Sequence, residues 1–310
     1  MNRRDFLMTA AGAVAVARVR PLRAQAPKSA RPATLDRIAI MSLNFQRILN
    51  VPDVQPGPER SLELFDLAQM IADTYGVHRV ELQHYHLAST EPSYLKELRG
   101  RVEKSKSRIT QINLEFGQLN MSAPQQRDRV MAIDLTKMWV DHASALGAQR
   151  VMINQGSPTH DNKRDGIPTL KAMADYGRSK GIIVSVETRG GGGGRSVAAA
   201  PTPAPTVSPL TGPPAWDLLA EILRGAGAYS NVDVGGANAA NQEELHHCLR
   251  LLFPMTAGSM HTRVNPRWDL ATAIRFLERD LGYNGLYTIE SSNGHEGTRE
   301  IYDVVVATLG

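Results

Sequence analysis

The sequence has very little cysteine, since Cys248 is the only one among 310 residues. A single cysteine excludes an internal disulfide framework and a cysteine-rich zinc module. The chain also lacks any run of about 18 uncharged apolar residues, which excludes a polytopic membrane protein. Hydrophobic residues make up 42% of the chain and charged residues 21%, a composition typical of a folded globular protein and not of a disordered one.

The excess of positive charge is confined to the N-terminus. The formal net charge is +4, but residues 1–26 hold five of the 35 basic residues and only one of the 31 acidic residues. The remaining chain has 30 of each and is formally neutral. Because a nucleic-acid-binding protein needs a basic patch on its folded domain, we expect no nucleic-acid partner.

The first 26 residues contain the parts of an export signal in the usual order. Arg3 and Arg4 precede an uncharged apolar stretch at 6–17, and Ala24-Gln25-Ala26 forms a small-x-small cleavage site. This arrangement resembles the signal of the twin-arginine export pathway. It predicts a twin-arginine signal peptide at 1–26 and an exported, periplasmic or extracellular protein. The apolar stretch is too short for a stable membrane anchor.

The rest of the chain alternates short apolar runs with amphipathic stretches, as strands followed by helices do. The eight predicted strands are 38–43, 79–82, 109–114, 150–153, 182–187, 231–234, 257–261 and 286–290. The eight predicted helices are 60–75, 92–106, 124–146, 166–180, 214–226, 241–252, 268–280 and 296–308. Eight such units predict a single α/β domain over residues 36–310, folded as a (β/α)8 TIM barrel.

An open doubly wound sheet is the alternative fold for this alternation. Such a sheet usually carries a glycine-rich phosphate loop after its first strand, whereas residues 44–47 contain no glycine. We therefore expect the barrel. One segment, 190–214, is rich in glycine and proline and predicts a flexible insertion, which is either a tolerated surface loop or a lid over the site.

Polar side chains end four successive predicted strands. Glu187 ends the fifth, Asp233 lies in the sixth, His261 ends the seventh and Glu290 ends the eighth. A barrel builds its active site at these carboxyl ends, so the four side chains are expected at one rim. Each alone would suit a rim salt bridge or a helix cap. Together, three carboxylates and an imidazole would repel without a cation, so they favour one divalent metal ion, Mn, Mg, Co or Zn.

The motifs around these residues resemble those of a known family. It resembles the xylose isomerase-like TIM barrel superfamily, in particular its sugar phosphate isomerase/epimerase-type proteins. The resemblance covers roughly residues 36–309, and its motifs are Gly-Val-His-Arg-Val-Glu81-Leu, Val-Ser-Val-Glu187, Asn-Val-Asp233-Val-Gly, His261-Thr-Arg263 and Gly282-Tyr-Asn-Gly-Leu-Tyr-Thr-Ile-Glu290. The last of these is the most specific, and the others gain weight from their order.

The resemblance implies that Glu187, Asp233, His261 and Glu290 bind the metal. It also implies that Glu187 and Glu290 are catalytic and exchange the proton on a substrate carbon, with Arg263 holding a substrate oxygen. One departure concerns the position three residues after Asp233. Family members often have His or Asn there, whereas this chain has Gly236, which puts one substrate contact in doubt.

Two weaker candidates for substrate binding also lie at predicted strand ends. His84 follows the second strand and is either a substrate contact or part of a solvated loop. Asn154 ends the fourth strand and could hydrogen-bond a sugar hydroxyl. Glu81, in the second strand, is a further candidate for an inward-facing or rim carboxylate.

The predicted function is a divalent-metal-dependent sugar isomerase or epimerase that acts on a ketose or keto-sugar by proton transfer through an enediolate. The alternatives are a keto-sugar or keto-glycoside lyase or dehydratase using the same site, a metal-dependent phosphodiester hydrolase similar to apurinic endonucleases, or a non-catalytic sugar-binding protein. The expected partner is a small-molecule sugar, with a homo-oligomer as an open possibility. An exported enzyme meets free sugars, and no phosphate-cradling glycine loop follows the seventh or eighth strand.

Overall fold

The computed structural model describes residues 32–51, 60–117, 119–153, 156, 158–188 and 213–310. The predicted signal peptide at 1–26 and nearly all of the predicted insertion at 190–214 lie outside these residues. No helix in the described part of the chain combines the length and the apolar character needed to cross a membrane.

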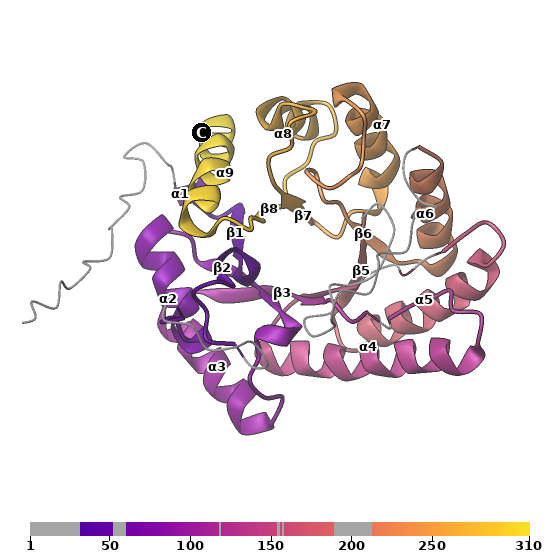
Figure 1. Ribbon diagram of the computed structural model, residues 1–310, viewed down its shortest axis with the longest axis horizontal. Helices are drawn as coiled ribbons and strands as arrows, with labels where there is room; N and C mark the ends of the chain where they lie inside the picture. Colours follow the sequence, from indigo (N-terminus) through magenta and orange to yellow (C-terminus); the bar gives the residue numbers. More distant parts are fainter. Residues whose placement is uncertain (1–31, 52–59, 118, 154–155, 157, 189–212) are drawn as a thin grey trace, which may run out of the picture.

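Eight parallel strands form the centre of the described structure (Figure 1). They are β1 Ile38–Met41, β2 Arg79–Gln83, β3 Arg108–Leu114, β4 Arg150–Ile153, β5 Ile183–Glu187, β6 Tyr229–Asn231, β7 Ser259–Thr262 and β8 Leu286–Ile289. Their hydrogen-bonded order is β6-β5-β4-β3-β2-β1-β8-β7. Parallel bridges Asp233↔His261 and Ser230↔Thr256 link the two end strands. The strands therefore form a nearly closed barrel, which confirms the predicted (β/α)8 TIM barrel.

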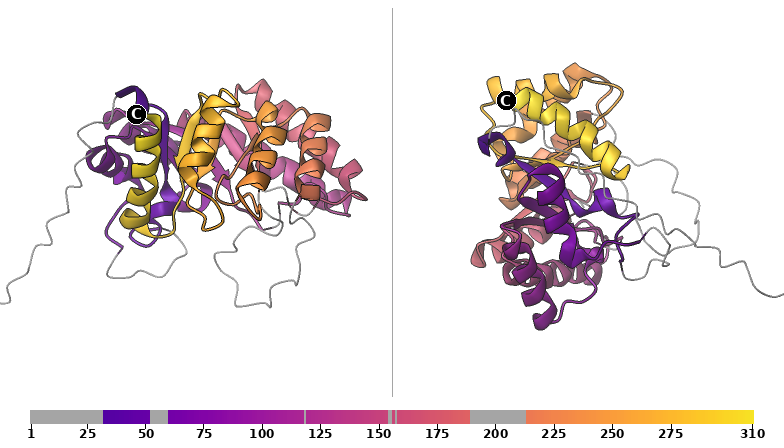
Figure 2. Two further views of the ribbon diagram at one scale, coloured as in Figure 1. Left: turned by 90° about the horizontal axis from the view of Figure 1, so that it is seen from above. Right: turned by 90° about the vertical axis from the view of Figure 1, so that its left-hand side faces the viewer.

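Helices cover the outside of the barrel on every side seen in Figures 1 and 2. They are α1 Pro32–Leu35, α2 Leu64–Tyr75, α3 Pro92–Lys104, α4 Gln126–Leu146, α5 Lys163–Ser179, α6 Pro213–Ala226, α7 Gln242–Leu252, α8 Leu270–Arg279 and α9 Gly294–Leu309, with short 3-10 turns η1 Ser42–Phe45, η2 His84–His86 and η3 Phe253–Met255. The short α1 precedes the predicted domain and packs beside α9. Apolar strand and helix faces meet in one continuous core.

Local sequence signals explain where several helices begin and end. Gly76 and Gly147 follow α2 and α4 with φ of +68° and +75°, a left-handed conformation that favours glycine after a helix. The side chain of Asn241 accepts from two backbone N–H groups at the start of α7, and Asp269 accepts from one at the start of α8. These signals mark the ends of α2 and α4 and the starts of α7 and α8.

Every predicted strand and helix is present, and the differences lie at the ends. The predicted first strand ran to Leu43, but residues from Ser42 onward form η1. The predicted sixth strand began at Asn231, whereas β6 ends there. This shift occurs where the barrel closes through two single bridges, from Ser230 in β6 to Thr256 before β7 and from Asp233 after β6 to His261 in β7, so regular pairing stops before Asp233. The carboxyl ends of the strands nevertheless face one rim, as expected.

Candidate metal centre and substrate pocket

Four predicted ligands lie at the carboxyl end of the barrel. Glu187 is the last residue of β5, His261 lies in β7 and Glu290 directly follows β8. Asp233 lies two residues beyond β6 and bridges to the backbone of His261. All four are buried, with at most 6% of each residue exposed. Backbone hydrogen bonds between neighbouring strands hold these positions. For example, the Glu290 N–H donates to Thr262 O at 3.0 Å.

Three of these side chains form a compact cluster. His261 Nδ1 lies 2.8 Å from Glu187 Oε1 and 3.3 Å from Glu290 Oε2. One ligand atom from each of the three residues lies within 4.8 Å of the other two. This spacing, together with one imidazole and two carboxylates as donors, fits a single divalent ion.

The opposite nitrogen of His261 faces another carboxylate. Its Nε2 lies 2.6 Å from Oε1 of Glu81, which β2 brings in from across the barrel. Burial by itself would lower the pKa of His261. The negative charge of Glu81 and the hydrogen bonds to Glu187, Glu290 and Glu81 outweigh burial and raise this pKa well above its ordinary value. The carboxylates at this rim thus stabilise a positive charge at this position.

Asp233 does not join the cluster. Its Oδ1 accepts from Arg263 Nε at 3.2 Å and from the Gly236 N–H at 2.7 Å, while its Oδ2 pairs with a terminal nitrogen of Arg263. Burial raises the pKa of Asp233 to about 6, with Glu290 and Glu187 adding to the effect and Arg263 opposing it. The structure therefore brings three of the four predicted ligands together and pairs the fourth with a guanidinium.

Two glycines make room for Arg263. A Cβ built on Gly235 would overlap the Arg263 side chain, and a Cβ on Gly236 would overlap both the Asp233 carboxylate and the Arg263 guanidinium. The glycine at position 236, where the family resemblance implies His or Asn, thus leaves room for the Asp233–Arg263 pair. Arg263 occupies the space where the side chain of residue 236 would begin, and its guanidinium reaches both Asp233 and Glu290.

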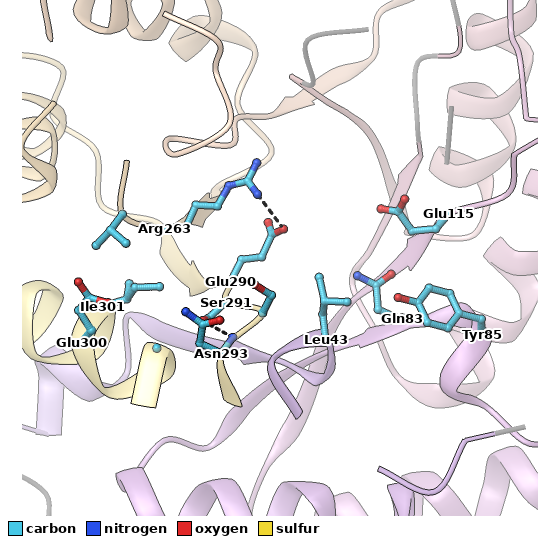
Figure 3. A pocket seen from close by; sticks show the side chains of 13 residues that line it. Leu43, Gln83, Tyr85, Glu115, Arg263, Glu290, Ser291, Asn293, Glu300 and Ile301 are labelled. Atoms are coloured by element: carbon cyan, nitrogen blue, oxygen red, sulfur yellow. Dashed lines mark hydrogen bonds and ion pairs between the residues drawn. The ribbon is translucent and has the colours of Figure 1, made fainter. Parts of the chain in front are cut away.

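A pocket of about 360 Å³ opens beside the cluster. Glu290 and Arg263 point toward one another in Figure 3, and the Glu115, Gln83 and Tyr85 side chains lie across from them. The lining residues are Leu43, Gln83, Tyr85, Glu115, Arg263, Val264, Glu290, Ser291, Ser292, Asn293, Gly297, Glu300 and Ile301. A pocket of this size, with several convergent polar groups, suits a small polar ligand.

The sequence did not single out the far wall of this pocket. Gln83 is the last residue of β2 and Glu115 is the first residue after β3, so the strand-end rule that identified Glu187 applies to both. Ser291 follows Glu290 in the loop before α9. Asn44 holds this loop by accepting from the Ser291 N–H at 2.9 Å, a contact between distant segments that local sequence does not indicate.

The other predicted substrate contacts lie elsewhere. His84 is buried behind the rim, with its ring 3.9 Å from the ring of Phe116 between centroids and its Nδ1 accepting from the Glu115 N–H at 3.1 Å. It does not line the described pocket. A role for His84 in substrate binding stays a prediction. Asn154 lies outside the described residues.

Comparisons with known proteins add support at the level of the fold. No protein-family model matches the sequence, and no curated protein matches it. Solved structures do match. A D-tagatose 3-epimerase-like protein has a TM-score of 0.63 at 15% identity, over 88% of this chain and 97% of its own. The 3-keto-D-glucoside 4-epimerase of E. coli has a TM-score of 0.62 at 10% identity, over 88% and 99%.

A xylose isomerase-like TIM barrel protein from Mycobacterium smegmatis in complex with magnesium has a TM-score of 0.56 at 16% identity, over 90% of this chain and 99% of its own. These neighbours include a 3-keto-D-glucoside 4-epimerase and a xylose isomerase-like TIM barrel protein. At such low identities they show only that this chain shares their barrel fold.

Replacing Gly236 with Ala tests whether Arg263 depends on the space that this glycine leaves open. The new methyl group should displace the guanidinium from Asp233 and lower the free energy of unfolding by about 2 kcal/mol. Urea unfolding measures the loss. Gly100→Ala is the control, because a Cβ at this exposed helical position meets no neighbouring atom.

In an Arg263→Ala background the cost of Gly236→Ala should shrink, because one of the two overlapped groups is gone and the Asp233 carboxylate is no longer held by the guanidinium. Equal costs in both backgrounds would show that Gly236 does not act through Arg263.

The buried histidines of η2 predict how stability depends on pH. Burial lowers the pKa of His84 to about 4 and that of His86 to about 3, against about 6.5 in an unfolded chain. Between these values the unfolded chain binds more protons, so the free energy of unfolding falls as pH drops from about 6.5 toward 4. His86→Gln should make this fall smaller by about 3 kcal/mol.

Urea unfolding across this pH range checks the slope, with His247→Gln at an exposed position of α7 as the control. A His86→Gln slope equal to that of the wild type would contradict the assignment.

Proposed function

We propose that the protein is a divalent-metal-dependent isomerase or epimerase of a ketose or keto-sugar, working by proton transfer through an enediolate. One observation carries this proposal. Glu187, His261 and Glu290 converge within 4.8 Å at the carboxyl end of the barrel, and Glu290 also lines a polar pocket. The shared fold with sugar epimerases supports the same reaction class.

Glu187, His261 and Glu290 would hold the ion, with Asp233 as the expected fourth ligand once it exchanges its bond with Arg263. When bound, the ion would polarise a substrate carbonyl and the neighbouring hydroxyl, which makes the hydrogen on the adjacent carbon more acidic. The glutamates supply carboxylates that remove and return this proton. Arg263, which borders both Glu290 and the pocket, would orient a substrate oxygen.

The charge of the pocket favours a sugar without phosphate. Its lining includes the carboxylates of Glu115, Glu290 and Glu300, which would repel a phosphate dianion. The Arg263 guanidinium already faces Asp233 and Glu290. Hydroxyl groups can instead donate to these carboxylates. We therefore propose a neutral ketose, keto-sugar or keto-glycoside as the substrate.

A lyase or dehydratase acting on a keto-sugar is the second candidate, because it would begin with the same proton abstraction and then expel a β-substituent. A hydrolase similar to apurinic endonucleases fits less well, since the metal-ligand cluster in the described part of the chain contains a single histidine, His261. We further propose that residues 1–26 direct export by the twin-arginine pathway, which would place the enzyme among free sugars and glycosides.

The test is proton exchange in deuterated water. Metal-free protein, reloaded with Mn²⁺ or Co²⁺, is incubated with a panel of ketoses and 3-keto-glycosides, and ¹H NMR follows loss of the hydrogen next to the carbonyl. Wild-type enzyme should exchange this hydrogen only when loaded. Glu290→Gln should slow the exchange by about 10²- to 10⁴-fold, because it removes a group that carries the proton.

Glu243→Gln, at an exposed position at the start of α7, serves as the control and should exchange normally. Inversion at the exchanging carbon identifies an epimerase, and release of a β-substituent identifies a lyase. Full exchange by Glu290→Gln would refute the proposed mechanism.

A further inference from the structure

Glu81 lies outside the compact cluster but contacts its histidine. The two ring nitrogens of His261 point away from one another, and each faces a different carboxylate. Nδ1 faces Glu187 at 2.8 Å and Glu290 at 3.3 Å. Nε2 faces Glu81 at 2.6 Å. An ion bound among Glu187, Nδ1 and Glu290 therefore leaves Nε2 pointing at Glu81, on the far side of the ring.

The barrel holds the Glu81 carboxylate in place. Glu81 is fully buried, and its Oε1 also accepts from Asn113 Nδ2 at 2.7 Å. Asn113 in turn accepts from Gln111 Nε2 at 3.0 Å, so a chain of side chains from β3 fixes the carboxylate. Because burying an ionised carboxylate is costly, this arrangement needs a positively charged or N–H partner, which His261 supplies.

An irregularity in the sheet lies directly at Glu81. The register between β2 and β3 shifts between Val80 and Glu81, so that Glu81 pairs with Gln111 and Gln83 pairs with Asn113. The shift leaves Thr110 between the paired residues, with its Oγ1 donating to Val80 O at 3.1 Å. Irregularities of this kind re-aim side chains near functional sites. Here the first pair beyond the shift, Glu81 and Gln111, lies against His261.

We propose that Glu81 is a positioning residue that selects the metal-binding nitrogen of His261. By accepting the proton on Nε2, Glu81 fixes the tautomer in which Nδ1 carries the free lone pair, and it fixes the plane of the ring. A carboxylate on the second nitrogen also makes the histidine a stronger ligand. This inference rests on the proposed metal site and adds a residue to it that is not itself a ligand.

Zinc titration provides the test. Zn²⁺ is titrated calorimetrically into metal-free wild type, Glu81→Gln, Glu187→Gln and Thr136→Val. Glu81→Gln should weaken binding about 10- to 100-fold, because the amide holds the ring less firmly than a carboxylate does. Glu187→Gln is the reference for a lost ligand and should weaken binding further. Thr136→Val, which removes a buried hydrogen bond within α4 on the outside of the barrel, should bind normally.

A second measurement reads the tautomer directly. In wild-type protein with ¹⁵N-labelled histidine and bound Zn²⁺, long-range ¹H–¹⁵N NMR should show the metal on Nδ1 of His261 and a proton on Nε2. In Glu81→Gln the Nε2 proton should lose the downfield shift that a carboxylate acceptor gives it. The wild-type spectrum decides the assignment even where the variant folds poorly.

The outcomes separate the two proposals. Wild-type protein that binds no Zn²⁺ would refute the proposed metal centre. Wild-type protein that binds Zn²⁺ through Nε2, or Glu81→Gln that binds as tightly as Thr136→Val, would refute only the role of Glu81. Glu81→Gln that loses binding as completely as Glu187→Gln would make Glu81 a ligand and also overturn the positioning role.

Discussion

The imidazole of His261 lies between carboxylates on both of its nitrogens, buried at the carboxyl end of the barrel. Glu81, Glu187 and Glu290 would repel one another at these distances if no positive charge stood among them. Their contacts with His261 tie β2, β5 and β8 to β7 across the barrel. The same crowding of acidic oxygens that raises the pKa of His261 suits the site to a divalent ion. Stability of the barrel rim and capacity for a metal thus arise from one electrostatic constraint.

A second ion pair, between Arg263 and Asp233, lies between the Glu187–His261–Glu290 cluster and the pocket. Arg263 packs against Gly235 and Gly236 and faces both Asp233 and Glu290. In this arrangement Asp233 is committed to the guanidinium and stays apart from the cluster. For Asp233 to serve as a ligand, as the family resemblance implies, Arg263 has to release it and turn toward the pocket. The arginine therefore lies in contact with both the carboxylates of the candidate metal centre and the pocket.

The sequence predicted the barrel and its chemical rim well, because both follow from local patterns. Apolar runs mark the strands, and the fixed topology of a barrel brings their carboxyl ends together, so Glu187, His261 and Glu290 could be placed in one site without coordinates. Contacts across the barrel could not be predicted in this way. Glu81 contacts His261 from β2, at the point where the β2–β3 register shifts, and Arg263 reaches Asp233 through space that Gly235 and Gly236 leave open. His84 ends a strand as expected, but the 3-10 turn that follows buries its ring against Phe116.

The central claim is that one divalent ion binds between Glu187, His261 Nδ1 and Glu290. Anomalous diffraction from crystals of the protein loaded with Mn²⁺ tests this claim most directly, because the signal locates the metal without reference to activity. The account predicts a single strong peak among these three side chains, at the Nδ1 edge of the His261 ring and away from Glu81. A peak bonded to Nε2, two or more peaks in the barrel, or no peak in fully loaded crystals would contradict it.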